Sequence, residues 1–338
     1  MRKGPFRRTA GAALTAAAVL LAVTDAPGTA ASGTAPATYP EPGLVRGDVV
    51  VHDPSMIRTG DGTYYVFSTH NGIEMRSSVN RTDFARADPA FPDGVPWAAD
   101  FTGGDTHELW APDVSRHGGR YYLYISASSF GSNHSAIGLA VSTSAKPGTW
   151  QDQGIVYSSE SGGDFNAIDP SLTVDRGGKW WLVFGSWWSG IKMIQIDPAT
   201  GKQLASNPTR YNVARRTSDA LGIEGPFIFR HGKYYYMFTS WDLCCRGVDS
   251  TYKIMVGRSA SITGPYVDRA GTALSAGGGT EVLSSHGSRV IGPGGQTVLT
   301  DGDQDLLVYH YYDATDNGTP KLGLNPLGFD SAGWPYVH

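Results

Sequence analysis

The stretch VHDPSMIRTGDGTYYVFST, residues 51–69, combines an Asp-Pro pair, a Gly-centred turn and an aromatic segment. Similar stretches follow at 109–128 (LWAPDVSRHGGRYYLYISAS), 166–187 (NAIDPSLTVDRGGKWWLVFGSW), 223–241 (IEGPFIFRHGKYYYMFTSW) and 291–312 (IGPGGQTVLTDGDQDLLVYHYY). In each copy a proline stands near the start of one strand, glycines form the turn, and aromatic and β-branched residues form the next strand. The sequence therefore predicts five related β-hairpin units.

The spacing of the five copies is nearly constant. Aligning their prolines gives Pro54, Pro112, Pro170, Pro226 and Pro293, which are 58, 58, 56 and 67 residues apart. Repeats of about 40–60 residues that hold several short strands are typical of β-propellers. We therefore expect an all-β fold, a five-bladed β-propeller over residues 45–338, with blades of about four antiparallel strands. Two separate sandwich domains would not explain one period that continues to the end of the chain.

The first 31 residues predict a secretory signal peptide. Four basic residues precede an apolar run at 10–23, and the following GTAAS offers small residues for cleavage. The apolar run is shorter than the roughly 20 residues that a membrane span needs. A linker rich in Pro, Gly, Ala and Thr follows at 32–44. We expect a secreted, extracellular protein that is not bound to a membrane.

Composition and charge limit the class of partner. The formal charge of the whole chain is −4, and it becomes −7 once residues 1–31, with four basic groups and one acidic group, are removed. An acidic protein lacks the positive surface that binds nucleic acid or anionic membranes. The 44 glycines and the aromatic content of 11% suit turn-rich β structure and surfaces on which sugars stack. These features are compatible with a neutral polysaccharide partner, and we expect a monomer.

The two cysteines are adjacent, at positions 244 and 245. They cannot form a disulfide framework or a zinc site. In an oxidising compartment they could form a disulfide with each other, or they could remain two buried thiols.

Three carboxylates recur beside the aligned prolines. Asp53 and Asp169 precede their prolines directly, and Glu224 stands two residues before Pro226. In a propeller, equivalent positions at the start of each innermost strand face a common axis, so these side chains are expected to share one cavity. Each Asp-Pro pair could also be a simple turn cap, and the functional interpretation therefore depends on the convergence of all three.

Carboxylates gathered in one cavity raise each other's pKa values. A protonated carboxyl opposite an ionised one can hydrolyse a glycosidic bond. If about 6.5–9.5 Å separates the two groups, a water fits between base and sugar and the reaction inverts the anomeric configuration. The pattern therefore indicates an inverting glycoside hydrolase.

Several motifs resemble those of the arabinanases of glycoside hydrolase family 43. They are VHDPS, ELWAPDV, SSFGSNHSAIGLAVS, NAIDPSL, GSWWSGIKMIQID, IEGPFIF and CCRGVDSTYKIMVGRS, and the resemblance runs from about residue 45 to the final GWPYVH. It implies a five-bladed, inverting, extracellular enzyme that cuts α-1,5-linked L-arabinofuranose chains. It further implies that Asp53 is the general base, that Glu224 is the general acid, and that Asp169 raises the pKa of the acid and orients it.

Sugar-binding residues are expected beside these acids, because furanose rings stack on aromatic side chains and their hydroxyls need polar partners. Of the Trp187-Trp188 pair, strand alternation would turn only one ring towards the sugar. The core is the alternative location for each aromatic ring, and we prefer it for Trp181 and Tyr235. Asn166, Ala167 and Ile168 flank Asp169, and the resemblance implies substrate contacts for Gly131 and Ser186, which lie in motifs that the family uses around substrate. The predicted substrate-binding residues are Trp110, Phe130, Gly131, Asn166, Ala167, Ile168, Ser186, Trp187 and Trp188.

The last repeat departs from the family pattern. Arabinanases of this type usually carry a His in a GPGH motif that helps to hold a metal, often calcium, near the acids. Here the motif is GPGG, and Gly295 offers no side-chain ligand. Water or His286 would have to complete such a site. No cofactor is required for the chemistry, and the sequence names no metal ligand.

Three functions are compatible with the sequence. The leading one is an endo-acting arabinanase with an open groove across the axis. An exo-acting arabinosidase would need a wall, for which the segments 82–108 and 270–282 are candidates. A non-catalytic sugar-binding propeller would not need all three carboxylates.

Overall fold

The computed structural model describes residues 1, 39–218 and 221–338. The chain divides into two units, Met1–Ala37 and Thr38–His338. The predicted signal peptide lies outside the described residues, apart from Met1, and so does the first part of the predicted linker. Among the described residues, no helix has the length and apolar character of a membrane span.

The unit from Thr38 onwards consists of five β-sheets, each formed by consecutive strands. Short helices interrupt the connections. The first sheet is β1 (Arg46–Gly47), β2 (Ser55–Arg58), β3 (Tyr64–Ser68), β4 (Glu74–Ser78) and β5 (Asp83–Ala87), followed by η1 (Pro96–Ala98) and α1 (Ala99–Thr102). The second is β6 (Trp110–His117), β7 (Arg120–Ala127), β8 (Ser135–Ser142) and β9 (Gln151–Ser159). The third is β10 (Ser171–Val174), β11 (Trp180–Phe184), β12 (Ile191–Asp197), β13 (Lys202–Gln203) and β14 (Tyr211–Ala214). The fourth is β15 (Ile223–His231), β16 (Tyr234–Trp241), η2 (Gly247–Asp249), β17 (Lys253–Ser259), η3 (Leu274–Ala276) and β18 (Thr280–Leu283). The fifth is β19 (Val290–Asp301), β20 (Gln304–Asp313), η4 (Ala314–Asp316), β21 (Thr319–Phe329) and β22 (Pro335–Val337).

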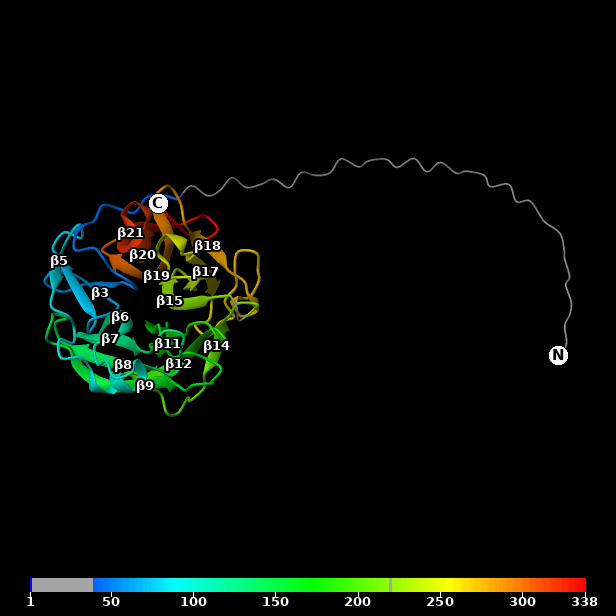
Figure 1. The fold of residues 1–338 in the computed structure, drawn as a ribbon, viewed down its shortest axis with the longest axis horizontal. Helices are drawn as coiled ribbons and strands as arrows, with labels where there is room; N and C mark the ends of the chain where they lie inside the picture. Colours follow the sequence, from blue (N-terminus) through cyan, green and yellow to red (C-terminus); the bar gives the residue numbers. More distant parts are fainter. Residues whose placement is uncertain (2–38, 219–220) are drawn as a thin grey trace. The chain divides into compact units, whose positions relative to one another are not determined.

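The sheets are arranged as a ring. Each innermost strand lies against those of the two neighbouring sheets, in the order β2, β6, β10, β15, β19 and back to β2. Figure 1 shows the sheets following one another around the ring in chain order, from blue and cyan through green and yellow to orange. The antiparallel hairpins pair as the repeats require, for example Ser55 with Phe67 and Ser171 with Val183. The predicted five-bladed β-propeller is confirmed.

The hydrophobic core lies between the blades. Each of the five clusters of buried apolar side chains combines residues of two neighbouring sheets. Phe67 of the first sheet and Leu123 of the second share one cluster, and both are fully buried. Trp181 and Tyr235 are buried in another, as expected for core residues. Because every blade buries both faces, second strands such as β3 are apolar on both sides, which explains the continuous aromatic runs in the sequence.

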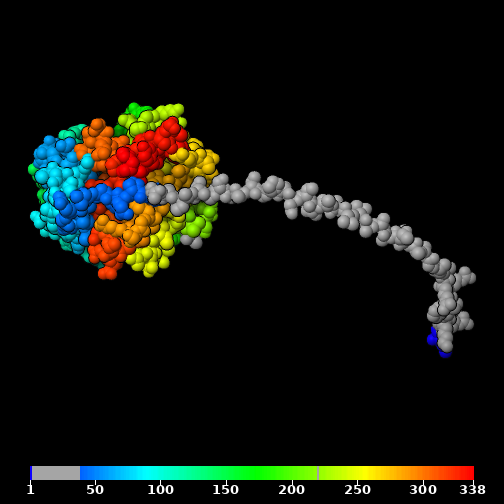
Figure 2. All heavy atoms as spheres, turned by 90° about the horizontal axis from the view of Figure 1, so that it is seen from above, coloured from blue at the N-terminus to red at the C-terminus, as the bar shows by residue number. Residues whose placement is uncertain are grey.

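The start of the described chain closes the ring. β1 pairs in parallel with β5, Gly43 N donates to Leu324 O, and Leu322 N donates to Val49 O. Figure 2 shows this blue segment running between the red and orange parts of the last sheet. Backbone hydrogen bonds to both the first and the last blade therefore join them, a feature for which the repeats give no signal.

The fifth proline does not occupy the position predicted for it. Pro54, Pro112, Pro170 and Pro226 line the axial cavity, whereas the last blade contributes Gly295, Gln296 and Thr297. Register shifts between Ile291 and Gly294, and again between Gly294 and Thr297, displace the strand. Bulges add residues that a proline alignment cannot detect. The alignment of Pro293 with the other four was therefore wrong.

Candidate active site

The five innermost strands all begin at the same end of the axis, where a cavity is lined by residues of every blade. Asp53 and Asp169 are among its lining residues, and Gly225, directly after Glu224, is another. In a four-stranded antiparallel blade the loop between the second and third strands returns to this same end. Residues 128–134, 185–190 and 242–252, which form such loops, therefore surround the cavity entrance. The sequence prediction that three distant carboxylates meet at the axis agrees with this geometry.

Asp53 is held through one of its two carboxylate oxygens. His52 Nδ1 and Thr69 Oγ1 both donate to Oδ2, each over 2.8 Å. The backbone N–H of Asp53 donates to Nδ1 of His310 over 3.1 Å. At Gly295, which has φ +58°, an added Cβ would lie 2.6 Å from Oδ1 of Asp53. The glycine therefore leaves Oδ1 free of side-chain contact on that side.

Asp53 is an ionised carboxylate. Its burial alone would raise its pKa, but the charge and hydrogen bond of His52 and the Thr69 hydroxyl together lower the pKa below the usual range. For the pKa of His52 the two effects have opposite signs to those at Asp53. Burial lowers its pKa, yet the charges of Asp53 and Glu224 raise the net value above that of an ordinary histidine.

His310 lies at the axis as a neutral ring. It is fully buried and stacks on His52 with 3.9 Å between ring centroids. Burial, followed by the charge of His52, lowers its pKa well below the usual value. Its Nδ1 is 3.6 Å from Oδ1 of Asp53, but this contact is not an ion pair because Nδ1 already accepts the Asp53 amide hydrogen. The remaining proton therefore resides on Nε2, which has no hydrogen-bond partner among the described residues.

Glu224 receives two hydroxyl donors. Ser186 Oγ donates to Oε2 over 2.6 Å, and Tyr252 Oη donates to Oε1. Burial raises the pKa of Glu224, the two hydroxyls lower it, and the charge of Asp53 raises it again, with a net increase. Tyr252 keeps its proton because burial and the neighbouring carboxylates raise its own pKa well above 10.

Asp169 is the third member of the cluster. Its Oδ2 accepts the backbone N–H of Gly225 over 3.0 Å, and its own N–H donates to Ser126 Oγ. Burial, and then the charges of Glu224 and Asp53, raise its pKa well above the usual value. The surroundings therefore favour a proton on Asp169 or Glu224 and the ionised form of Asp53.

A fourth carboxylate also lines the cavity. Asp113 is 3% exposed, and its Oδ2 accepts the backbone N–H of Leu172 over 2.8 Å. Burial raises its pKa to about 7. Asp113 was not among the predicted site residues, although it directly follows the aligned Pro112.

The predicted sugar-binding residues of the second blade lie at the cavity end of the propeller. Phe130 is 87% exposed, and Gly131 beside it occupies a turn with φ +79°. Trp110 begins β6, is half-buried and donates from Nε1 to Glu108 Oε1 over 2.6 Å. An exposed phenyl ring and a half-buried indole ring are therefore available on this face.

The predicted residues of the third blade have less free surface. Asn166 is 3% exposed and donates from Nδ2 to Ser132 O, while its Oδ1 has no partner in the described part of the chain. Ala167 is fully buried and Ile168 is 7% exposed, so both side chains belong to the protein interior. Ser186 is 3% exposed, and its hydroxyl contacts Glu224.

Trp187 and Trp188 do not follow the strand alternation that the sequence suggested. Both have left-handed φ angles, 51° and 40°, and both lie between the end of β11 and the start of β12. Both are half-buried, and an added Cβ at Gly222 would lie 2.8 Å from the Trp187 ring. The alternation argument was wrong because this segment is a turn.

Most of the residues that hold the carboxylates were not predicted from the sequence. Thr69, Tyr252, His310 and Tyr312 lie in or next to strands away from the aligned prolines. Their position near the axial end of a second or third strand was the one sequence signal for these residues. It can be used only after the order of the strands in each blade has been recognised. His52 could be anticipated from the sequence, because it directly precedes Asp53.

The residues around Gly295 do not fit a calcium ion. Among the described residues, one group has the spacing of a metal site, and it consists of His52, Asp53 and His310. Calcium prefers oxygen ligands, whereas this group is mainly nitrogen, and Asp53 already bonds to both rings. His286 does not reach the axis, because its two ring nitrogens contact Ser284 O and Pro40 O.

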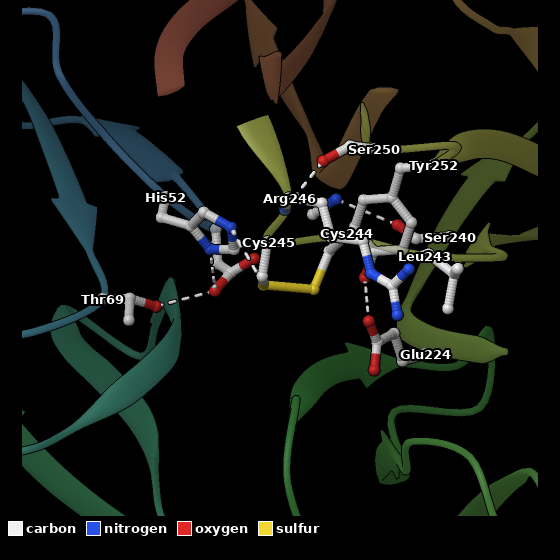
Figure 3. The surroundings of a disulfide bond; sticks show 12 residues. His52, Thr69, Glu224, Ser240, Leu243, Cys244, Cys245, Arg246, Ser250 and Tyr252 are labelled. Carbon is white, nitrogen blue, oxygen red and sulfur yellow. Dashed lines mark hydrogen bonds and ion pairs between the residues drawn. A yellow bond between two sulfur atoms is a disulfide. The ribbon is translucent and has the colours of Figure 1, made fainter. Parts of the chain in front are cut away.

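The adjacent cysteines form a disulfide, Cys244–Cys245, at the cavity end of the fourth blade. Figure 3 shows it with His52 on one side and with Tyr252 and Glu224 on the other. Cys245 Sγ lies 3.7 Å from His52 Nε2. Of the two alternatives left by the sequence, the structure contains the disulfide.

Known proteins share this architecture. Extracellular endo-alpha-(1->5)-L-arabinanase 1 of Bacillus subtilis is 41% identical over 289 residues, which are 85% of this chain and 87% of the relative. An extracellular exo-alpha-(1->5)-L-arabinofuranosidase of Cellvibrio japonicus is 40% identical over 302 residues, 86% of each chain. A solved structure of Cellvibrio cellulosa alpha-L-arabinanase complexed with arabinohexaose matches with a TM-score of 0.82 and 39% sequence identity. The match covers 86% of this chain and 96% of the chain in that structure. Residues 47–335 match the profile of glycosyl hydrolases family 43. The chain therefore belongs to glycosyl hydrolase family 43, as its motifs predicted.

Proposed function

We propose that this protein hydrolyses the α-1,5-linked L-arabinofuranose chains of arabinan. The observation that carries the proposal is the division of the carboxylates, in which the surroundings lower the pKa of Asp53 and raise the pKa values of Glu224 and Asp169. The names of two relatives specify the alpha-(1->5) linkage, and a third relative binds arabinohexaose. Exposed Phe130 and half-buried Trp110 offer stacking surfaces for such a chain.

In the proposed mechanism Glu224 protonates the leaving oxygen as general acid. Asp53 removes a proton from the attacking water through Oδ1, because Oδ2 is occupied by His52 and Thr69. Asp169 raises the proton affinity of Glu224 by like-charge repulsion and holds the Gly225 backbone in place. Direct attack by water without a covalent intermediate inverts the anomeric configuration.

Endo action is the form of the proposal that we favour. The candidate wall segment 270–282 packs against the third blade, where Arg215 N donates to Leu274 O. Neither this segment nor 82–108 contributes a residue to the axial cavity. Because the relatives include both endo- and exo-acting enzymes, exo action is the alternative.

Linear debranched arabinan tests the proposal. Chromatography of early products should give a mixture of oligosaccharides, whereas release of only a mono- or disaccharide would favour exo action. Proton NMR during hydrolysis should detect first the product anomer of inverted configuration. If the wild-type protein binds arabinan without cleaving it, or if Glu224→Ala is fully active, the proposed catalytic function is wrong and a sugar-binding propeller becomes the better account.

Secretion is part of the same proposal. The basic and apolar segments of residues 1–31 support export, and two relatives are named extracellular. Mass spectrometry of protein from the culture medium should give a mature N-terminus near residue 32.

A further inference from the structure

The loop between β16 and β17 contacts Glu224 directly and is connected to Asp53 through Tyr312 and His52. At one end it carries the Cys244–Cys245 disulfide, and at the other Tyr252, which donates to Glu224. Its backbone is held by the pair Leu243 and Thr251, in which each N–H group donates to an oxygen of the other residue. Cys245 is exposed and Cys244 half-buried, so the disulfide can be reached from solvent. The proposed mechanism assigns no role to the disulfide.

Hydrogen bonds connect this loop to Asp53. The backbone N–H of Cys245, a residue with φ +67°, donates to Tyr312 Oη over 2.6 Å. Tyr312 Oη lies 2.9 Å from His52 Nε2, and His52 Nδ1 donates to Asp53 Oδ2 over 2.8 Å. The Tyr312 hydroxyl can pair with Nε2 in either protonation state of His52, because it donates to a neutral ring and accepts from a charged one. In both states Nδ1, the nitrogen that faces Asp53, carries a proton.

The consequence for Asp53 is a fixed orientation. With His52 and Thr69 both donating to Oδ2, the carboxylate cannot rotate without losing two hydrogen bonds. Without the Tyr312 hydroxyl a neutral His52 ring could take the other tautomer, and Oδ2 would then face an unprotonated nitrogen. A charged ring would lose the contact that holds its Nε2 edge. A small displacement of a catalytic group can reduce the rate about 100-fold.

We propose that the Cys244–Cys245 disulfide and Tyr312 position the Asp53 carboxylate through His52, so that reduction of the disulfide slows hydrolysis. The inference rests on the proposed function, because Asp53 must be the general base. The step itself is a two-electron reduction. A dithiol reductant transfers two electrons and two protons, the S–S bond breaks to give two thiols, and the reductant becomes a cyclic disulfide. The adjacent residues are then no longer linked, and the Cys245 N–H is free to turn away from Tyr312.

Several other groups face His52 and Asp53 and will contribute to any pH profile. His310 and Tyr312 come from β20, and Tyr252 comes from the same loop as the disulfide. The charge of Glu224 acts on His52, and the charge of Asp53 acts on Asp169. A comparison of variants is therefore needed to isolate the Tyr312 contact.

Tyr312→Phe removes only the connecting hydroxyl. Its matched control is Tyr311→Phe, in the same strand, where the ring points to the opposite side and contacts Arg289. We expect Tyr312→Phe to lower kcat on linear arabinan by about 10- to 100-fold with little change in KM, and to move the acid limb of the kcat profile to higher pH. Tyr311→Phe should keep the wild-type profile. Equal profiles for the two variants would overturn the proposal.

Reduction with dithiothreitol tests the disulfide directly, with mass spectrometry after alkylation to count two free thiols and a thermal melt to verify folding. Folded, reduced protein should lose kcat as Tyr312→Phe does, and reduction of Tyr312→Phe should add little, because both changes break one chain of contacts. Full activity of the folded, reduced protein would overturn the proposal. Asp53→Asn separates failure of the proposed function from failure of this inference. If Asp53→Asn remains active, Asp53 is not the general base and the proposed function is wrong. If Asp53→Asn is inactive but Tyr312→Phe has wild-type activity, only the positioning role of Tyr312 and the disulfide is refuted.

Discussion

Oδ2 of Asp169 accepts the backbone N–H of Gly225, the residue directly after Glu224, over 3.0 Å. This hydrogen bond joins the carboxylate of the third blade to the backbone that carries the carboxylate of the fourth. Because the two acids also repel each other, each raises the other's affinity for protons.

Asp169→Asn should separate these two contributions. The amide oxygen of Asn can still accept the Gly225 N–H, but the charge is lost. Without that charge the upper pKa of the pair falls, so the basic limb of the kcat/KM profile should move to lower pH. A pH series from about 4 to 9 measures the effect. An unchanged basic limb would mean that Asp169 does not raise the pKa of the acid.

Ser186→Ala should move the same limb in the opposite direction. The Ser186 hydroxyl donates to Oε2 of Glu224 over 2.6 Å and lowers its pKa, so its removal raises that pKa. A general acid with a higher pKa stays protonated to higher pH. We therefore expect the basic limb to shift upwards, with a loss of a few-fold in kcat at the optimum. A downward shift would contradict the assignment of Glu224 as the acid.

Asp113→Asn should change how stability depends on pH. The folded protein raises the pKa of Asp113 from 3.8 to about 7, so between these values the native state holds a proton that the unfolded chain has released. This carboxylate therefore lowers the free energy of unfolding as pH rises from about 4 to 7, by up to roughly 1.4 kcal/mol per pH unit. Asn has no such proton and keeps an oxygen for the Leu172 N–H.

Thermal melts at pH 5 and pH 8 test this expectation. The Tm difference between Asp113→Asn and wild type should be more positive at pH 8 than at pH 5. Asp93→Asn, which alters an exposed carboxylate, is the control and should show no such difference. The same Tm offset at both pH values would mean that Asp113 is ionised without penalty in the folded state.

Phe130→Ala should weaken substrate binding without loss of stability. The ring is 87% exposed at the cavity end of the second blade, so the fold gains little from it. Loss of one stacking surface is expected to raise KM for arabinan about 3- to 10-fold at unchanged Tm. Val79→Ala is a control, because Val79 is 84% exposed and follows β4 at the opposite end of the propeller. An unchanged KM would show that Phe130 lies outside the substrate path.

Much of the fold could be predicted from the sequence, because each blade repeats the same local signals. Pro54, Pro112, Pro170 and Pro226 each mark the inner strand of a blade, and the turns between first and second strands are rich in glycine. The fifth proline was misleading, because register shifts in β19 moved Gly295 and Gln296 into the position that Pro293 was expected to hold. A bulge changes the register without changing the composition.

The site was predictable only where its residues belong to the repeat. Asp53 and Asp169 occupy equivalent positions, and Glu224 stands close to the corresponding position of its own blade. The groups that set their protonation, such as His310 and Tyr252, belong to other strands and approach the acids only after the ring closes. Trp187 and Trp188 lie in a turn, where the strand alternation that was used to orient them does not apply.

The activity of Asp53→Asn on linear arabinan tests the central claim most directly, since that claim is that the ionised Asp53 activates the attacking water. Asn preserves the shape of the side chain and an oxygen for the Thr69 hydroxyl, but it cannot accept the proton. For a variant with wild-type Tm, kcat/KM is expected to fall about 100- to 10,000-fold, the usual range for loss of a general base. A value within a few-fold of wild type would contradict the account.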